Sequence, residues 1–390
     1  MKDNLIRLTF GGDVMAFASE NEARLARYGK YDYSDYLSYL KPLCVDSDYV
    51  CANLETPVAP SMPFTARAAE FNSPPELLVA LKDVGFSFLS TANNHCLDRN
   101  IDGLKETLTQ LVDFGFDHDG TFSSVEDAGR LFIKSICGAN GKCCKIAIVA
   151  CTFGTNSQHN GNMLSPENEW CVALTRRQLK KKNIGFNPDV GKPCQYEYIV
   201  DDVSPAAIGN PIHQIYLDKV LSKIRQAKME ADIVIAMPHV GGQYNPAPGM
   251  YAKYIFRELK SAGADMIVGG HPHVSQRSEK RGTSFYTYSL GNLCFTPGIG
   301  YYIPNTLADY GIVLHAYFDS ELFKLQKVTF DVVKSIKCAD GLTRVMPVTD
   351  IYAAETNLSR RERLEMENEA VVNRFRGTGG SIAISKEYPF

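Results

Sequence analysis

Short apolar runs alternate with helix-like segments over the first 150 residues. Leucines at helical spacing follow the Ser73-Pro74 start and end before Gly85, and a second stretch of this kind runs from Asn100 to Gly115. Four apolar runs of strand length, each leading into a polar loop, lie at 7–10, 49–53, 86–91 and 145–152. This β-α-β rhythm predicts an α/β protein built on a sheet.

The stretch 153–211 breaks the rhythm. It is rich in Asn, Gly and Pro and holds the single tryptophan, Trp170. We interpret it as an insertion that lies over the functional site, in the manner of a lid. Its basic run could meet an anionic chain or could be an ordinary solvated helix face. That run consists of Arg176, Arg177, Lys180, Lys181 and Lys182.

The alternation returns after the insertion. Helices are predicted at 217–227 and up to Gly263, and strands at 232–240 and 265–274. Later strands are expected at 284–292, 311–318 and 325–333, the last two antiparallel. We therefore expect one domain over 1–349, which includes the insertion, followed by a helix and a loosely held tail over 350–390.

Composition narrows the class of protein. A formal net charge of −3 argues against a general nucleic-acid binder, which carries a basic excess. The first residues contain no apolar leader region, and no run approaches 18 apolar residues, so we expect no transmembrane segment. Eleven scattered cysteines without a C-x-x-C pair predict reduced, mostly buried thiols in a cytoplasmic protein.

Polar residues with metal-ligand chemistry follow the predicted strands. The carboxyl ends of strands in an open α/β sheet converge on one crevice, where ligands bind. Each residue alone has a plainer explanation as a turn former, helix cap or hydrogen-bonded core residue. His271-Pro-His273 is more specific, because two imidazoles one residue apart in an extended segment can flank a metal pair. The candidate ligands are Asp13, Glu55, Asn94, His239, His271 and His273.

Imidazole and carboxylate donors favour zinc, manganese or iron over calcium. One or two divalent ions are therefore the expected cofactor.

Six linked strings in the chain resemble the poly-γ-glutamate capsule biosynthesis family known as CapA or PgsA. They are GGDVM, NLE, TANNHCLD, PHVGGQY, GGHPHV and YSLGN, and they span roughly residues 5–320. That family is similar to the calcineurin-like metallophosphoesterases. The resemblance implies a four-layer α/β/β/α sandwich of two mixed sheets. It also places members that act on exported polymers at the membrane, facing outward, which is at odds with a cytoplasmic location.

The resemblance implies a role for each matching residue. Glu55 corresponds to a carboxylate that bridges two metals, and the other five candidates to the remaining ligands. His95 corresponds to an outer-sphere acid, with Asp98 orienting its imidazole. Asn292 either positions substrate or simply forms a turn after a strand. Arg67 and Arg277, together with Arg281, are candidates for binding substrate carboxylates or phosphates.

Two positions depart from the related enzymes. Met15 stands where metallophosphoesterases usually have a histidine, and a thioether does not replace imidazole for a hard divalent ion. Gln243 stands where many relatives have glutamate. Both changes weaken the expectation of two tightly bound metals and of ordinary phosphoesterase activity.

Three functions remain open at this point. The first is a metal-dependent hydrolase or transferase acting on a phosphoester or γ-glutamyl polymer-related substrate. The second is a catalytically degenerate accessory protein that binds polymer within a capsule synthesis complex. The third is a general phosphodiesterase or phosphatase. The expected partners are an anionic polymer or a phosphorylated small molecule, together with capsule synthesis proteins.

Overall fold

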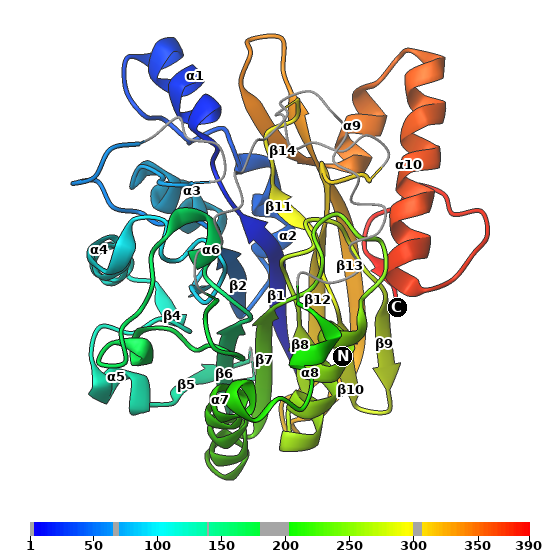
Figure 1. The fold of residues 1–390 in the computed structure, drawn as a ribbon. Helices are drawn as coiled ribbons and strands as arrows, with labels where there is room; N and C mark the ends of the chain where they lie inside the picture. Colours follow the sequence, from blue (N-terminus) through cyan, green and yellow to red (C-terminus); the bar gives the residue numbers. More distant parts are fainter. Residues whose placement is uncertain (1–3, 65–69, 139, 180–202, 299–305) are drawn as a thin grey trace.

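The fold consists of two mixed β-sheets that pack face to face, with helices on their outer faces (Figure 1). The computed structural model describes residues 4–64, 70–138, 140–179, 203–298 and 306–390. Among these residues, no helix is long and apolar enough to cross a membrane.

The first sheet combines a parallel half with an antiparallel half. Strands β1 to β4 are parallel neighbours, whereas β12, β13 and β14 add to β1 in antiparallel fashion. The predicted antiparallel pairing at 311–318 and 325–333 is thus confirmed. In spatial order the strands are β14 (Thr343–Pro347), β13 (Leu325–Lys337), β12 (Tyr310–Asp319), β1 (Leu5–Val14), β2 (Tyr49–Leu54), β3 (Phe88–Ser90) and β4 (Asp117–Asp119), with β11 (Asn292–Cys294) beside β1 and β15 (Tyr388–Pro389) beside β13.

The second sheet has a parallel centre and two antiparallel edges. Strands β6, β7, β8 and β10 are parallel, and β5 and β9 pair antiparallel at the two edges. In spatial order they are β5 (Phe132–Cys137), β6 (Cys143–Thr152), β7 (Ile233–His239), β8 (Met266–Val268), β10 (Ser284–Thr287) and β9 (Ser278–Arg281).

Alternation along the strands builds the layers. On β6, Ile146 and Ile148 belong to the core between the sheets, whereas Ala147 and Val149 pack against helices α7 (Pro211–Glu230) and α8 (Met250–Ala262). The outer face of the first sheet packs against α2 (Lys41–Cys44), α3 (Glu76–Val84) and α4 (Asn100–Asp113). The predicted α/β/β/α sandwich of two mixed sheets is therefore confirmed.

Further helices complete the fold. Helix α3 ends at Gly85 as predicted, in the left-handed conformation (φ 112°), but starts at Glu76, two residues after Pro74. The remaining helices are α1 (Ala18–Tyr28), η1 (Ser38–Leu40), α5 (Val125–Gly129), α6 (Ser157–Asn160), η2 (Glu169–Cys171), η4 (Pro205–Ala207), α9 (Val348–Ala354) and α10 (Leu358–Arg376).

The last residues are anchored to the first sheet. Helix α10 buries Val371 and Phe375 in the core between the sheets, and Tyr388 joins them from β15. The ring of Tyr388 stacks on Phe330 of β13 with centroids 5.3 Å apart. An irregular segment follows α10, and Tyr388 holds the end of the chain against the sheet.

The cysteines are mostly, but not all, free thiols. Seven are buried and free, and Cys338 is partly exposed. Cys137 and Cys143, which face each other across β5 and β6, form a disulfide. The prediction of reduced thiols was therefore wrong for this pair, because antiparallel pairing brings the two side chains together.

Candidate metal centre

A row of three polar side chains crosses the first sheet at the carboxyl ends of its parallel strands. The register pairs Asp13 of β1 with Asn53 of β2 on one side and with Asn292 of β11 on the other. All three are buried. Gly12 makes the close approach possible, because a Cβ there would lie 1.9 Å from the carbonyl oxygen of Gly291. Polar atoms are thus concentrated where the sheet opens to ligands.

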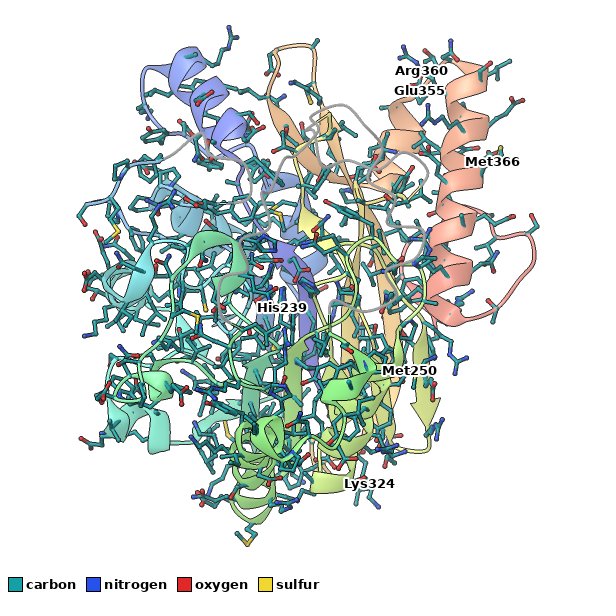
Figure 2. The ribbon with its side chains drawn as sticks, in the orientation of Figure 1. His239, Met250, Lys324, Glu355, Arg360 and Met366 are labelled. Atoms are coloured by element: carbon teal, nitrogen blue, oxygen red, sulfur yellow. A yellow bond between two sulfur atoms is a disulfide. The ribbon has the colours of Figure 1, made fainter. Side chains whose placement is uncertain are left out.

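The second sheet contributes its histidines directly opposite this row. His239 is the last residue of β7 and bridges to Gly270 after β8. A Cβ at Gly270 would lie 2.6 Å from Oδ1 of Asp13 and 3.3 Å from Nδ1 of His239. The glycine therefore lets the two sheets meet at the centre. Figure 2 shows His239 in the middle of the molecule.

The His271-Pro-His273 segment is not extended, contrary to our expectation. His271 has φ 95° and His273 has φ 57°, both in the left-handed region that non-glycine residues rarely adopt. Such a residue costs about 1–3 kcal/mol and persists only where its surroundings enforce it. Here the backbone N–H of His271 donates to Oδ2 of Asp13 at 3.0 Å. In this turned backbone both imidazoles lie in the centre, with Nδ1 of His271 3.2 Å from Nε2 of His239 and Nε2 of His273 3.7 Å from Oε1 of Glu55.

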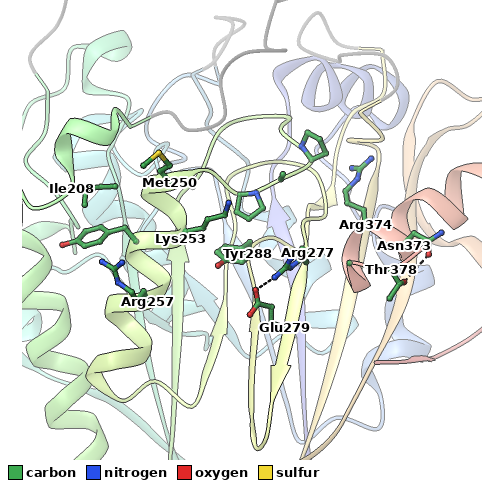
Figure 3. A pocket seen from close by; sticks show the side chains of 15 residues that line it. Ile208, Met250, Lys253, Arg257, Arg277, Glu279, Tyr288, Asn373, Arg374 and Thr378 are labelled. Atoms are coloured by element: carbon green, nitrogen blue, oxygen red, sulfur yellow. Dashed lines mark hydrogen bonds and ion pairs between the residues drawn. The ribbon is translucent and has the colours of Figure 1, made fainter. Parts of the chain in front are cut away.

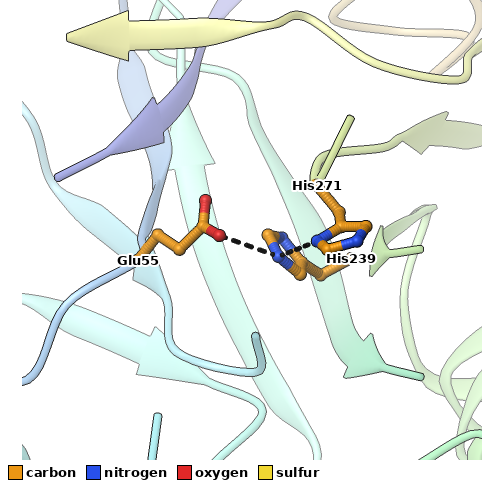
Figure 4. Close-up of side chains that lie close together, drawn as sticks. All are labelled: Glu55, His239 and His271. Carbon is orange, nitrogen blue, oxygen red and sulfur yellow. Dashed lines mark hydrogen bonds and ion pairs between the residues drawn. The ribbon is translucent and has the colours of Figure 1, made fainter. Parts of the chain in front are cut away.

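One group of donors surrounds Nε2 of His239. This nitrogen lies 3.2 Å from Nδ1 of His271 and 3.2 Å from Oε1 of Glu55 (Figure 4). It also lies 2.7 Å from Oδ1 of Asn94. Two donors that bind one ion at about 2.0–2.2 Å lie roughly 3 Å apart. The observed spacing is that of ligands around a single divalent ion.

A second group consists of Asp13, Glu55 and His273, with donor atoms within 4.8 Å of one another. The Nδ2 of Asn292 donates to the carbonyl oxygens of His273 and Ala308 at 3.1 and 2.8 Å, so its Oδ1 is the acceptor. Nδ1–H of His273 donates to that oxygen at 3.0 Å. The lone pair of His273 is therefore on Nε2, 3.7 Å from Oε1 of Glu55.

Glu55 belongs to both groups, and its charge is not compensated by hydrogen bonds. Both of its carboxylate oxygens are buried without a hydrogen-bond partner among the described residues, as is Nδ2 of Asn94. A buried carboxylate left in this state is costly. A cation bound between the two groups would remove that cost. The donor set therefore fits divalent metal, which these residues could hold.

The pKa values of Asp13 and His273 also fit a site for a cation. Burial, together with the negative charge of Glu55, raises the pKa of Asp13 to about 7. Burial lowers the pKa of His273 to about 4, which keeps its imidazole neutral and able to act as a ligand. The carboxylates of Asp13 and Glu55 beside the neutral imidazole of His273 form a site that favours a cation.

His95 and Asp98 form a dyad beside the ligands. Nδ1 of His95 lies 2.6 Å from Oδ2 of Asp98, which also accepts from the backbone N–H of Phe71 at 2.8 Å. Burial acts to lower the pKa of His95, but the charge and hydrogen bond of Asp98 outweigh it and raise that pKa. The ring of His95 is also 4.3 Å from that of Phe71, centroid to centroid. The outward nitrogen, Nε2, is left for chemistry.

The described part of the 153–211 segment touches the centre. Nδ2 of Asn160 donates to Oδ1 of Asp98 at 3.2 Å, and Nδ2 of Asn156 is 3.5 Å from Nε2 of His95. The ring of Phe153 lies 4.6 Å from that of His271. Arg176 is buried, with Nε donating to the carbonyl oxygen of Phe153 at 2.8 Å, so it is not part of a solvated face. Lys180, Lys181 and Lys182 lie outside the described residues.

Met15 and Gln243 add no ligand to either group. The Met15 side chain is buried in an apolar cluster that includes Phe71, Tyr244 and Phe295. The Met15 side chain therefore serves packing. Gln243 is half-buried in the loop that follows His239.

The remaining predicted residues lie in different places. Asn292 is in the centre, where its Oδ1 accepts from Nδ1–H of His273. Arg277 lies in a separate cleft and pairs with Glu279, as does Arg281. Arg67 lies outside the described residues.

Three asparagines at the centre were not predicted from the sequence. Nδ2 of Asn53 donates to Oδ1 of Asp13 at 2.8 Å. Its signal was present, because Asn53 precedes Glu55 by two residues and so shares its face in a strand that is otherwise largely apolar. Asn156 and Asn160 come from the irregular segment, where no periodicity marks them.

Two capsule biosynthesis proteins are similar to this chain in sequence. PGA biosynthesis protein CapA of Bacillus subtilis (strain 168) is 27% identical over 297 residues, which cover 74% of this chain and 66% of that protein. Capsule biosynthesis protein CapA of Bacillus anthracis is 26% identical over 299 residues, or 75% and 60% of the two chains. The chain thus spans less than two thirds of either relative.

The crystal structure of a novel phosphatase from Mycoplasma pneumoniae is similar over 85% of this chain and 94% of that one, at 14% identity and a TM-score of 0.46. The family model described as bacterial capsule synthesis protein PGA_cap matches residues 7–297. The resemblance predicted from the six strings is confirmed, and the chain belongs to the bacterial capsule synthesis protein PGA_cap family.

Proposed function

We propose that this chain is a metal-dependent hydrolase or transferase that acts on a γ-glutamyl or phosphoester bond of a capsule polymer-related substrate. The observation that carries the proposal is Glu55, a buried carboxylate without hydrogen bonds that is common to both donor groups. Burying such a charge is costly, and a bound cation would offset that cost. Membership in the capsule synthesis family supports the polymer-related substrate.

The residues of the two groups would divide the binding of metal between them. Asn94, His239 and His271 would hold one ion and Asp13 and His273 a second, with Glu55 shared. A divalent ion supplies a Lewis acid that lowers the pKa of bound water and polarises the scissile group. We propose Mn, Zn or Fe, because imidazole and carboxylate donors suit these ions.

His95 would manage the proton of the leaving group. Asp98 holds Nδ1–H of His95 and stabilises the imidazolium, so that a proton resides on Nε2. From that atom it can be given to a leaving oxygen or nitrogen, a transfer worth about 10²- to 10⁴-fold in rate. Asn160 donates to Oδ1 of Asp98 and the backbone N–H of Phe71 donates to Oδ2, so the carboxylate is held in place on both oxygens.

A second candidate is an accessory protein that binds polymer without cleaving it. The packing of Met15 into the apolar cluster favours this candidate, because the group around Asp13 has no additional imidazole. The two candidates differ in the effect of losing His95. The enzyme would lose turnover, whereas the accessory protein has no turnover to lose.

The test combines metal analysis with turnover. Purified protein is expected to contain divalent metal, and His239→Ala and His271→Ala are each expected to deplete it. His213→Ala, a histidine on the outer helix α7, serves as the matched control and is expected to keep the metal. His95→Ala is expected to keep the metal and to lose turnover on phosphoester and γ-glutamyl substrates. Unchanged metal in both ligand variants would refute the centre, and polymer binding without turnover would favour the accessory role.

A cytoplasmic location is part of the proposal. Seven buried free thiols support it, because reducing compartments preserve thiols. The Cys137–Cys143 disulfide weighs against it for the same reason. Counting thiols in protein isolated without reductant decides whether this pair is oxidised in the cell.

A further inference from the structure

A cleft of about 1010 Å³ lies between the start of α8 and the end of α10 (Figure 3). Its walls are the start of α8, the loop 246–248, the strand segment around β9 and the end of α10. Four cationic side chains line it, and Glu279 is the one acidic residue among its lining. The cations are Lys253, Arg257, Arg277 and Arg374.

The positive charge of the cleft is only partly neutralised. Glu279 is shared, since Oε1 accepts from Arg277 at 2.5 Å and Oε2 from Arg281 at 2.6 Å. Within the described part of the chain, neither Lys253 nor Arg374 has a carboxylate within ion-pair distance. Arg374 donates to the carbonyl oxygen of Thr306 at 3.0 Å. A chain with a net charge of −3 therefore contains a locally positive cavity.

The start of α8 adds to this field. Met250, Lys253 and Tyr254, from its first turns, line the cleft. The N-cap is Gly249, which has no side chain to cap the helix. The positive end of a 13-residue helix therefore faces the same cavity as the cations, an arrangement that favours anions.

The segment that follows His273 connects the metal centre to the cleft in sequence. Arg277 follows His273 by four residues, so their Cα atoms lie within about 14 Å of each other. Nε2 of Gln276 donates to the carbonyl oxygen of Asn245 at 2.8 Å, which ties the two walls together. A Cβ at Gly377 would lie 2.9 Å from Cδ of Arg277, so the arginine stem rests on the end of α10.

We infer that this cleft binds an anionic arm of the substrate, an oligomeric chain of carboxylates of the γ-glutamyl kind, while the bond to be cleaved lies at the metal centre. The inference rests on the proposed function for the nature of the chain. The volume is at the upper end for ligand pockets and exceeds what a single small anion fills. Arginine forks bind carboxylates in pairs, and several spaced cations match several spaced charges.

The test measures binding by calorimetry on the full chain at low salt. The probe is a γ-linked glutamate oligomer of about eight residues, compared with a polyphosphate of similar charge and with inorganic phosphate. Lys253→Gln and Arg257→Gln, both exposed in the cleft, are each expected to raise the Kd for the oligomer roughly two- to fivefold, and about tenfold together. Lys260→Gln on α8 and Arg225→Gln on α7 are matched controls outside the cleft and are expected to leave the Kd unchanged.

Three results would overturn the inference. They are an oligomer that does not bind wild-type protein, a double variant that binds it as wild type does, and polyphosphate binding without glutamate binding. His239→Ala is expected to keep oligomer binding, because the cleft cations do not depend on metal. Cleft-dependent binding with no turnover on any substrate would refute the proposed catalysis while leaving the cleft assignment in place.

Discussion

Replacing Glu55 with glutamine tests whether this carboxylate is held at an electrostatic cost for the sake of a cation. In the metal-free protein, burial and the charge of Glu55 raise the pKa of Asp13 from 3.8 to about 7. That difference of about 3 pKa units corresponds to about 4 kcal/mol of stability. Because the folded pKa is raised, this stability is present below about pH 4 and is lost as the pH rises through 7.

The substitution removes only the part of the cost that Glu55 causes. Burial is the larger cause of the raised pKa, so we expect Glu55→Gln to stabilise the metal-free protein by about 1–2 kcal/mol at pH 8. With saturating metal, the wild type is expected to be the more stable of the two proteins. Free ion at about 100 times its Kd stabilises the wild type by roughly 2.7 kcal/mol, whereas the variant has lost the shared ligand and gains little.

The assay is urea unfolding at pH 8, once with a chelator and once with saturating Mn²⁺. Glu20→Gln is the matched control, because Glu20 is also buried but is paired with Nε of Arg24 at 2.9 Å. That variant is expected to be less stable than wild type in both conditions. A Glu55→Gln variant that is less stable than wild type in the presence of the chelator would refute this expectation, since Glu55 would then be an ordinary structural residue.

Three further substitutions probe the centre. Gly270→Ala places a Cβ 2.6 Å from Oδ1 of Asp13 and is expected to lower the metal content of a still folded protein, as measured by elemental analysis and circular dichroism. Asp98→Asn removes the charge that raises the pKa of His95, so the alkaline limb of the pH–rate profile is expected to move to lower pH with metal retained. Met15→His is expected to tighten binding of the second ion in a metal titration; an unchanged titration would mean that the position does not face that ion.

The order of elements and the grouping of several candidate ligands could be predicted because they depend on local patterns. Strands such as β6 and β7 alternate between two buried faces, and apolar runs of strand length show this directly. Asp13, Glu55 and His239 could be grouped from their positions in the sequence because the carboxyl ends of parallel strands meet at one edge. Both predictions can be made without knowing which strands are neighbours.

Other features depend on contacts between distant parts of the chain. The row of Asn53, Asp13 and Asn292 exists only through the register of β2 and β11 with β1. Strand β11 has three residues and β15 has two, which is too short for periodicity to reveal. The disulfide of Cys137 likewise follows from the pairing of two strands and from no motif in the sequence.

The sequence by itself determined the α/β order, the family and the donor types at the strand ends, because hydrophobic period and strand-end position are local properties of the chain. Only the tertiary structure decided how these donors meet. In the folded chain His271 and His273 have left-handed backbone, and Asn160 contacts Asp98. Residues of α8 and α10 line one basic cleft. The reason is that packing two sheets together fixes distances between residues that the sequence separates by up to hundreds of positions.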